Sequence, residues 1–310
     1  MTRLLHYMGG SQTTALNPVR RGILLLAVFV ALWAVVEGLF GARLQQHYNL
    51  MQVVWSRYAA HLLCLFATGF RSGPAVFVRT RRPGFQLARS MLMLVMPLSF
   101  ALSLSVHDRP ATVWSVFWLS PLFVLMGARL WLGERASGWL WVLAIAGGIV
   151  AALMESAGPP SSVAGLLLPL SMSVSFSLYV VMTRSLRDEP PKSNLFFTAC
   201  GVFAVLTPMM PFVWVTPTLH DAVLLFLIGS GGLVALWALD RACAAVEVSR
   251  VAPVMHLHLV CLVLVSVIFD GTAPSLRQVS GALWICLVVL AIWMWSPLGS
   301  NTDGVASRHA

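Results

Sequence analysis

The sequence predicts an all-α polytopic membrane protein of ten transmembrane helices, built from two inverted five-helix repeats. Three observations lead to this prediction. Hydrophobic residues make up 58% of the 310-residue chain and charged residues only 10%, whereas soluble proteins carry about 25% charged residues. The apolar residues gather into ten runs, and most charges lie in the short gaps between them. An acidic residue closes the fourth and the ninth run, which indicates a duplication.

The ten runs have the length that a membrane helix requires. A bilayer core about 30 Å thick needs roughly 20 apolar residues in a helix. Breaks rich in Pro, Gly, Ser and charge separate the runs. The predicted spans are 22–40, 50–70, 85–106, 111–132, 138–154, 164–182, 195–215, 222–239, 246–269 and 279–295.

The charged residues predict the orientation of the spans. If the N-terminus is cytoplasmic, thirteen Lys and Arg residues lie in inside segments and three in outside segments. The positive-inside rule then predicts that both termini are cytoplasmic. The expected location is the cell (inner) membrane. The same distribution explains the net charge of +9 without nucleic acid, because the cations do not form one basic face.

The duplication predicts the arrangement of the two halves. Glu134 closes the fourth span and Asp270 the ninth, and each precedes a short polar link and another apolar run. Five spans per half is an odd number, so the second half must insert upside down, as in many secondary transporters. The expected segments are an N-terminal tail over 1–20, repeats over 21–157 and 162–296, and a C-terminal tail over 297–310.

Three stretches carry a resemblance to a known family. They are LSPLFVLMGARLWLGER at 119–135, with a proline inside the span and a Leu-Gly-Glu end, RACAAVEVSRVAP at 241–253 and QVVWSRY at 52–58. Their order and spacing resemble EamA-type carriers of the drug/metabolite transporter superfamily. Relatives often end the ninth span in Phe-Gly-Glu, whereas this chain has FDGTAP at 269–274. Whether Asp270 or Thr272 replaces that glutamate stays open.

The resemblance implies a secondary transporter that moves a small metabolite or drug by alternating access. Export is expected, with proton coupling as a further expectation. A metabolite importer of the same fold is the alternative, and a channel or scaffold subunit is a more distant one. No GxxxxGK[ST], HExxH or GxSxG motif is present, so neither an ATP pump nor an enzyme is expected. The expected partners are the lipid bilayer, a small-molecule substrate and protons, with no cofactor, metal or nucleic acid.

Glu37 and Arg57 are the most informative charges in the spans. A charge at the bilayer centre costs about 2.5–3.5 kcal/mol on insertion scales, and such residues are functional candidates. Both lie toward the outer ends of neighbouring spans, so an ion pair is expected. Arg57 can bind an anionic substrate group, the pair can form an outer gate, or it can be a static bridge.

Two histidines are further candidates for the substrate path. His61 follows Arg57 by four residues on the same helix face, where it can couple protons or simply pack. His256 is a candidate for the cavity wall. His258 lies about 200° away from it around a helix, so the two cannot readily chelate one metal ion.

Aromatic residues inside the spans can contact a ligand. Trp33 and Trp118 lie away from the interface belts, where they can stack on a planar or cationic ligand or fill the core. Tyr179 shares a helix face with Ser171 and Ser175, which can bind substrate or serve packing.

Four residues are expected to shape helices rather than bind substrate. Pro121 and Pro253 each remove a backbone hydrogen bond and are hinge candidates, with a static bend as the alternative. Glu134 and Asp270 are expected to be structural at helix ends, Glu134 by pairing with Arg135 or another cytoplasmic arginine.

Small residues in the fifth span predict close helix packing. Ala144–Gly148 and Gly147–Ala151 have small-xxx-small spacing. This face is expected to pack within the bundle or in a homodimer.

Overall fold

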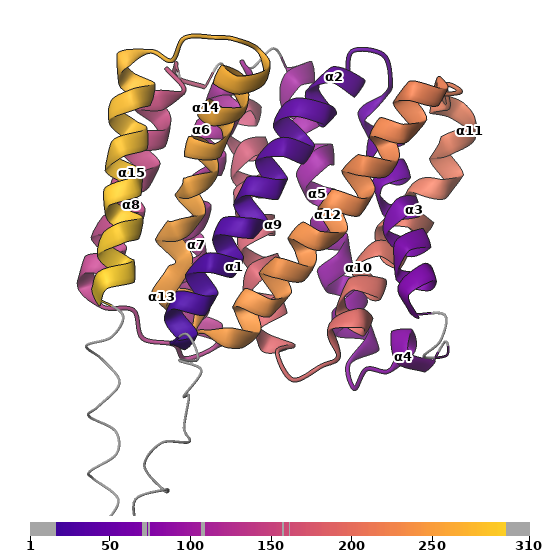
Figure 1. The fold of residues 1–310 in the computed structure, drawn as a ribbon, viewed down its shortest axis with the longest axis horizontal. Coiled ribbons are helices and arrows are strands. Elements are labelled where there is room, and N and C mark those ends of the chain that lie inside the picture. The colour runs from indigo at the N-terminus through magenta and orange to yellow at the C-terminus, as the bar shows by residue number, and fades with distance from the viewer. Residues whose placement is uncertain are drawn as a thin grey trace, which may run out of the picture.

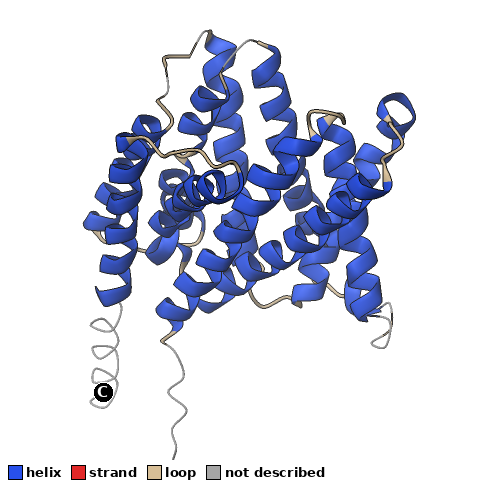
Figure 2. Ribbon diagram, turned by 45° about the horizontal axis from the view of Figure 1, so that its top comes forward, coloured by secondary structure: helices blue, strands red, loops and turns tan. Residues whose placement is uncertain are grey.

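The computed structural model describes residues 17–69, 73, 75–106, 109–156, 158–160 and 162–295. In these residues all regular structure is helical (Figure 2). Nine helical segments among them are long and apolar enough to cross a membrane, and the apolar helix Gly138–Met154 is shorter. The chain is therefore an all-α polytopic membrane protein, as predicted. Most of the two predicted tails lies outside the described residues.

The helices follow the predicted spans closely. The first half contains α1 (Pro18–Trp33), the π-helical η1 (Ala34–Gly41), α2 (Ala42–Leu44), α3 (Leu50–Gly69), α4 (Ala75–Val78), α5 (Pro83–Ser105), α6 (Pro110–Phe117), α7 (Ser120–Trp131) and α8 (Gly138–Met154). The second half contains α9 (Val163–Ser185), α10 (Pro191–Leu206), η3 (Thr207–Met209), α11 (Met210–Val213), α12 (Leu219–Ala245), α13 (Val248–Val251), η4 (Ala252–His256), α14 (Leu257–Phe269) and α15 (Leu276–Trp295).

The long helices run between two ends of the bundle (Figure 1). We call the end that holds α2 the α2 end and the opposite one the α4 end. Helix α1 begins and α15 finishes at the α4 end. Helices α1 and α12 pack against each other through the centre, α8 and α15 form one flank, and α3 and α10 the other.

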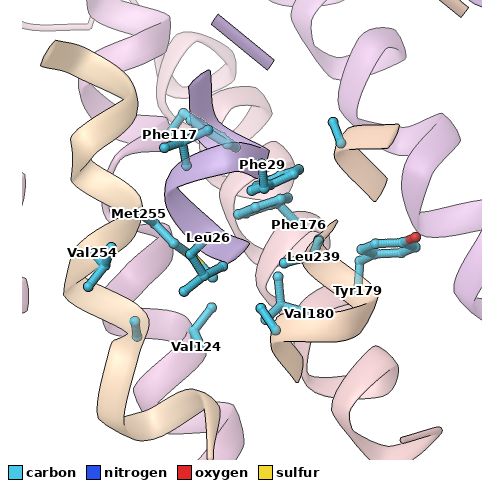
Figure 3. Close-up of a cluster of buried hydrophobic side chains, with 14 of the residues drawn as sticks. Leu26, Phe29, Phe117, Val124, Phe176, Tyr179, Val180, Leu239, Val254 and Met255 are labelled. Carbon is cyan, nitrogen blue, oxygen red and sulfur yellow. The ribbon is translucent and has the colours of Figure 1, made fainter. Parts of the chain in front are cut away.

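A cluster of buried hydrophobic side chains fills the centre of the bundle (Figure 3). Phe29 of α1 and Phe176 of α9 stack with ring centroids 6.3 Å apart. Phe117 packs on Phe176 at 5.6 Å, and Met255 brings η4 into the same cluster. The core therefore joins helices from both halves of the chain.

The fourth span is two helices rather than one helix with a proline inside. Helix α6 ends at Phe117 and α7 begins at Ser120, so Pro121 lies in the first turn of α7, where a missing N–H costs little. The helix is therefore interrupted just before Pro121 and not at it, and a hinge in this span stays a prediction. In lipid, freed carbonyls need partners. The Ser173 hydroxyl donates to Phe117 O at 3.0 Å, and His256 Nε2 lies 3.2 Å from Trp118 O.

The ninth span is broken in a similar way. Helix α13 ends at Val251, a 3-10 turn forms η4, and α14 begins at Leu257. Pro253 lies in the first turn of η4, so it too begins a helical segment instead of interrupting one. Both breaks lie where the two spans contact each other, because η4 packs on α7.

The fourth and ninth spans also end alike. Gly133 and Gly271 adopt positive φ values of 69° and 64°, which glycine adopts without strain. In each case the backbone N–H of the residue after the glycine donates to the carbonyl six residues earlier. Glu134 N–H donates to Ala128 O at 3.1 Å, and Thr272 N–H donates to Ser266 O at 3.4 Å. Thr272 thus occupies the place that corresponds to Glu134. Asp270 is the C-cap residue of α14, its backbone N–H donates to Ser266 O at 3.0 Å, and its side chain is exposed. Its structural role at the helix end stays a prediction.

The serines of α9 hold neighbouring helices. Ser171 bonds Ser99 at 2.8 Å, and Ser175 donates to Leu92 O at 2.7 Å, both on α5. Ser177 donates to Ser120 O at 2.9 Å at the start of α7. These contacts favour helix packing over substrate binding as the role of these serines.

Gly147 of α8 gives a direct test of close packing. A Cβ at this position would overlap the buried ring of His256, whereas a Cβ at Gly138 of the same helix would meet open space. The small-residue face thus packs within the bundle. We expect Gly147→Ala to lower the thermal unfolding midpoint, because overpacking costs about 1–3 kcal/mol. Gly138→Ala is the matched control and should leave the midpoint unchanged. Equal effects of the two substitutions would contradict this packing.

Candidate functional site

A cavity of about 360 Å³ lies inside the bundle. Its walls come from α1 and η1, α3, α5, α6, α9, α12 and α14. It reaches Gln45 and Pro110 near the α2 end, and Met93 and Tyr58 line it deeper in the bundle. Its volume and its mostly apolar wall are typical of sites for small organic molecules.

An ion pair lies in the cavity wall. Arg57 of α3 contacts Glu37 of η1, with 2.6 Å between Nη2 and Oε1. The side chains are 16% and 25% exposed, so both charges are partly withdrawn from solvent. Arg57 Nε is buried and has no hydrogen-bond partner among the described residues. The predicted pair is therefore present, and it leaves a donor on the guanidinium.

The local backbone explains how these two charges meet. Glu37 lies in the π-helical η1, and π-helical turns are frequent at functional sites. On the other side, Gly232 of α12 lets Arg57 and His61 approach, since a Cβ there would lie 3.0 Å from His61 Nε2 and 3.6 Å from Arg57 Cδ. A glycine in α12 thus makes room for the polar side of the cavity.

Two buried histidines line the cavity with unused ring nitrogens. His61 and His258 are each 1% exposed. His61 Nε2 and both nitrogens of His258 lack a hydrogen-bond partner among the described residues. Buried polar atoms usually have partners. A ligand in the cavity would supply these partners.

Aromatic rings form another part of the cavity wall. Trp33, Trp114, Phe29, Phe100 and Phe176 line the cavity. The ring centroid of Trp33 lies 5.3 Å from that of Phe176 and 4.6 Å from that of His258. The cavity wall thus combines aromatic rings, which suit a planar ligand, with a charged pair.

Three predicted residues are not in the wall of this cavity. Trp118 is fully buried at the break before α7, where its ring packs on His258 at 5.0 Å. His256 packs behind the wall against the carbonyls of Trp118 and Pro253. Tyr179 lies beyond the cavity floor, with its hydroxyl directed away from the Phe29–Phe176 pair (Figure 3). The prediction that these three residues line the cavity is therefore corrected. His258 lines the cavity wall, where His256 was predicted.

Glu134 makes contacts of a structural kind. Its carboxylate accepts a hydrogen bond from Arg184 Nε at 3.0 Å and from the Ser249 backbone N–H at 3.0 Å. The partner is thus Arg184 and not Arg135. At the start of the ninth span, Glu247 and Arg250 pair at 2.6 Å. In the described part of the chain, no group of three or more His, Cys, Asp or Glu side chains could hold a metal ion.

Comparison with known proteins gives relatives that are named as transporters. No family model matches the chain. A protein of Rickettsia bellii (strain RML369-C) named "S-adenosylmethionine uptake transporter" is 29% identical over 220 residues, which cover 69% of this chain and 74% of the relative. The protein of the same name in Rickettsia prowazekii (strain Madrid E) is 26% identical and covers 75% and 77%. A "Riboflavin transporter" of Vibrio cholerae serotype O1 is 28% identical and covers 73% and 76%.

A solved structure, named only "Crystal structure of protein", shares the fold. It matches 90% of this chain and 99% of its own, with a TM-score of 0.76 and 18% identity. At this identity the likeness concerns the fold alone. The predicted resemblance to EamA-type carriers is supported only coarsely, by relatives that are named as transporters.

The two histidines of the ninth span offer a matched pair of substitutions. We expect His258→Phe to keep or raise the thermal midpoint, since it replaces unpartnered buried nitrogens with an apolar ring. His256→Phe should lower it, because Trp118 O loses its partner at a cost of about 1–3 kcal/mol. Melting of the purified proteins in detergent measures both. A larger loss in His258→Phe would show that this side chain has a structural role instead.

Proposed function

We propose that this chain is a membrane transporter that takes up a small zwitterionic metabolite with a planar ring, of the type of S-adenosylmethionine. The observation that carries the proposal is the Glu37–Arg57 pair in the wall of an aromatic cavity. The names of the relatives support transport, and the two Rickettsia names support uptake.

The ion pair fits a zwitterion. A partly buried charge that loses its partner is left without compensation, which is costly. An α-amino acid group can replace both partners at once, with its carboxylate on Arg57 and its ammonium on Glu37. The guanidinium also binds a planar carboxylate through two parallel hydrogen bonds. The pair can therefore open for this substrate without leaving either charge bare.

The remaining wall fits the rest of such a molecule. A purine ring can stack on the aromatic wall that contains Trp33 and Trp114. The ring nitrogens of His258 and His61 can hydrogen-bond to its polar edge. A sulfonium cation is attracted to the face of an indole ring. Charge, ring and hydrogen-bonding groups thus each have a matching surface.

The proposed direction of transport differs from the one expected from the sequence. Export was the expected direction, and the relatives' names favour the importer that stood as its alternative. The positive-inside rule assigns the α2 end to the outside. A cavity that reaches toward this end suits a state that loads substrate from outside.

The transport cycle is proposed to be alternating access between two inverted halves, 21–157 and 162–296. The paired breaks and paired glycine ends of the fourth and ninth spans support this division. Glu37 is the proposed proton carrier, because it is a carboxylate in the cavity wall that exchanges its partner when the substrate enters and leaves. His61 is a second candidate for that role.

Riboflavin is the second candidate substrate. A relative is named a riboflavin transporter, and the aromatic wall would accept a flavin ring. Riboflavin carries no charge for Arg57 or Glu37 to bind, which makes the two candidates distinguishable.

Tracer uptake into proteoliposomes tests the proposal. Purified protein would be assayed with labelled S-adenosylmethionine and labelled riboflavin, with protein-free liposomes as the control. We expect uptake of S-adenosylmethionine that excess unlabelled riboflavin does not inhibit. Uptake of riboflavin alone would overturn the substrate proposal, and uptake of neither would leave the cavity without its proposed ligand.

A further inference from the structure

A buried polar cluster lies between the cavity and the α4 end. Its members share hydrogen bonds across α5, α9, α10 and α12, and they are Gln86, Arg89, Thr183, Asn194, Thr198 and Asp240. Arg89 is its centre and is 1% exposed. Its guanidinium donates to Thr183 Oγ1 at 2.9 Å, to Asn194 O at 2.6 Å and to Gln86 Oε1 at 2.8 Å.

The charge of Arg89 has no direct counter-ion. No carboxylate of the described residues lies within 4 Å of it, and Asp240 reaches the cluster only through Asn194 Nδ2, at 2.8 Å. Arg89 Nε is buried without a partner. The ring of Tyr179 lies 5.1 Å from the guanidinium carbon and attracts the cation, but it supplies no negative charge. A buried cation held by neutral groups is costly, so a binding role would explain why an arginine stands here.

The cluster continues the cavity wall along α5. Met93, Met96 and Phe100 line the cavity, and Gln86 and Arg89 precede them at the same alternating spacing of three and four residues. Residues so spaced share one face of a helix. Arg89 is therefore on the cavity face of α5, about one helical turn before Met93, which lines the cavity.

Two other helices continue in the same way. On α9, Phe176 lines the cavity and Thr183 lies seven residues further along the same face. On α12, Leu236 lines the cavity and Asp240 follows four residues later. Faces of three helices thus continue from the cavity wall into the cluster.

We propose that Arg89 is a second anion-binding site, which takes the substrate's carboxylate when the bundle opens at the α4 end. The proposal rests on the proposed transport function. In the present state α9 and α10 supply neutral oxygens to the guanidinium. Separation of these helices from α5 removes those oxygens, and a carboxylate restores both hydrogen bonds and charge balance. Arg57 and Arg89 then bind the same group in two successive states.

Two substrates that differ only in the carboxylate test the proposal. Arg89→Gln removes the charge and keeps a hydrogen-bonding side chain. We expect it to slow S-adenosylmethionine uptake by at least about tenfold, the loss of a charge-assisted contact worth about 1.4 kcal/mol or more. Decarboxylated S-adenosylmethionine also lacks the group that Arg57 binds and is therefore assayed at higher concentration, and its uptake should change much less in Arg89→Gln. Arg89→Lys should restore part of the rate for the carboxylated substrate. Equal slowing of both substrates would overturn the proposal and leave Arg89 as a packing residue.

A thiol assay decides the question without a known substrate. In a chain whose five native cysteines are replaced, Thr198→Cys places a thiol beside Arg89. We expect an anionic methanethiosulfonate, applied from the α4 side, to react faster than a cationic one, and Arg89→Gln to abolish that preference. No reaction, or no preference for the anion, would contradict the site. If S-adenosylmethionine is not transported at all, the proposed function fails while this assay still tests Arg89.

Discussion

Arg57→Gln is expected to weaken S-adenosylmethionine binding on the order of a hundredfold, because truncating one partner of a buried charge pair costs about 2–5 kcal/mol. The substitution removes the proposed carboxylate site and also leaves Glu37 without its partner at 2.6 Å. Equilibrium binding of the labelled compound to purified protein measures the effect.

Two further variants define what the loss at Arg57 means. Arg43→Gln removes an exposed arginine near the same end of the bundle and should leave the dissociation constant unchanged. Combining Glu37→Gln with Arg57→Gln removes both charges, so the double variant should fold but not bind. Binding that survives in Arg57→Gln would show that the pair is a static bridge between η1 and α3, one of its predicted alternatives.

Glu134→Ala is expected to be the most destabilising substitution at the α4 end. The carboxylate is 6% exposed and holds Arg184 and the Ser249 N–H, so it joins the ends of α7 and α9 to the start of α13. Its loss leaves Arg184 buried with only the carbonyls of Cys243 and Ala244. Breaking a buried pair in this way costs about 3–5 kcal/mol.

The comparison for Glu134→Ala is Glu247→Ala. Glu247 also pairs with an arginine, but its side chain is 37% exposed and that of Arg250 is 53% exposed. Exposed pairs contribute about 0–1 kcal/mol. Thermal midpoints of the two purified variants should therefore differ clearly. Similar midpoints would mean that the Glu134 contacts do not hold the three segments together.

The spans were predictable because membrane thickness dictates a long apolar run for each of them. Helix α8 was also predicted as a span, because its 17 residues still form one long apolar run. The break before Pro121 was not predictable in detail. Proline indicates a lost hydrogen bond, but only the contacts from Ser173 and His256 show which carbonyls are freed.

The charged part of the site was more predictable than the rest. Glu37 and Arg57 could be paired from sequence, because two opposite charges at similar depth on neighbouring spans have few other partners. The choice of His256 over His258 was wrong for the cavity, because apolar residues surround both and no amphipathic pattern shows which face is inward. Arg89 was missed near the start of its span. Its spacing from Met93 and Met96 was the available signal, and it has meaning only once those residues are known to line a cavity.

The sharpest test of the proposed site is a structure of the protein with S-adenosylmethionine bound. We expect the ligand in the cavity, with its carboxylate on Arg57, its ammonium on Glu37 and its purine ring against the wall of Trp33. A ligand bound elsewhere, or a Glu37–Arg57 pair that stays closed at saturating ligand, would refute the proposed site.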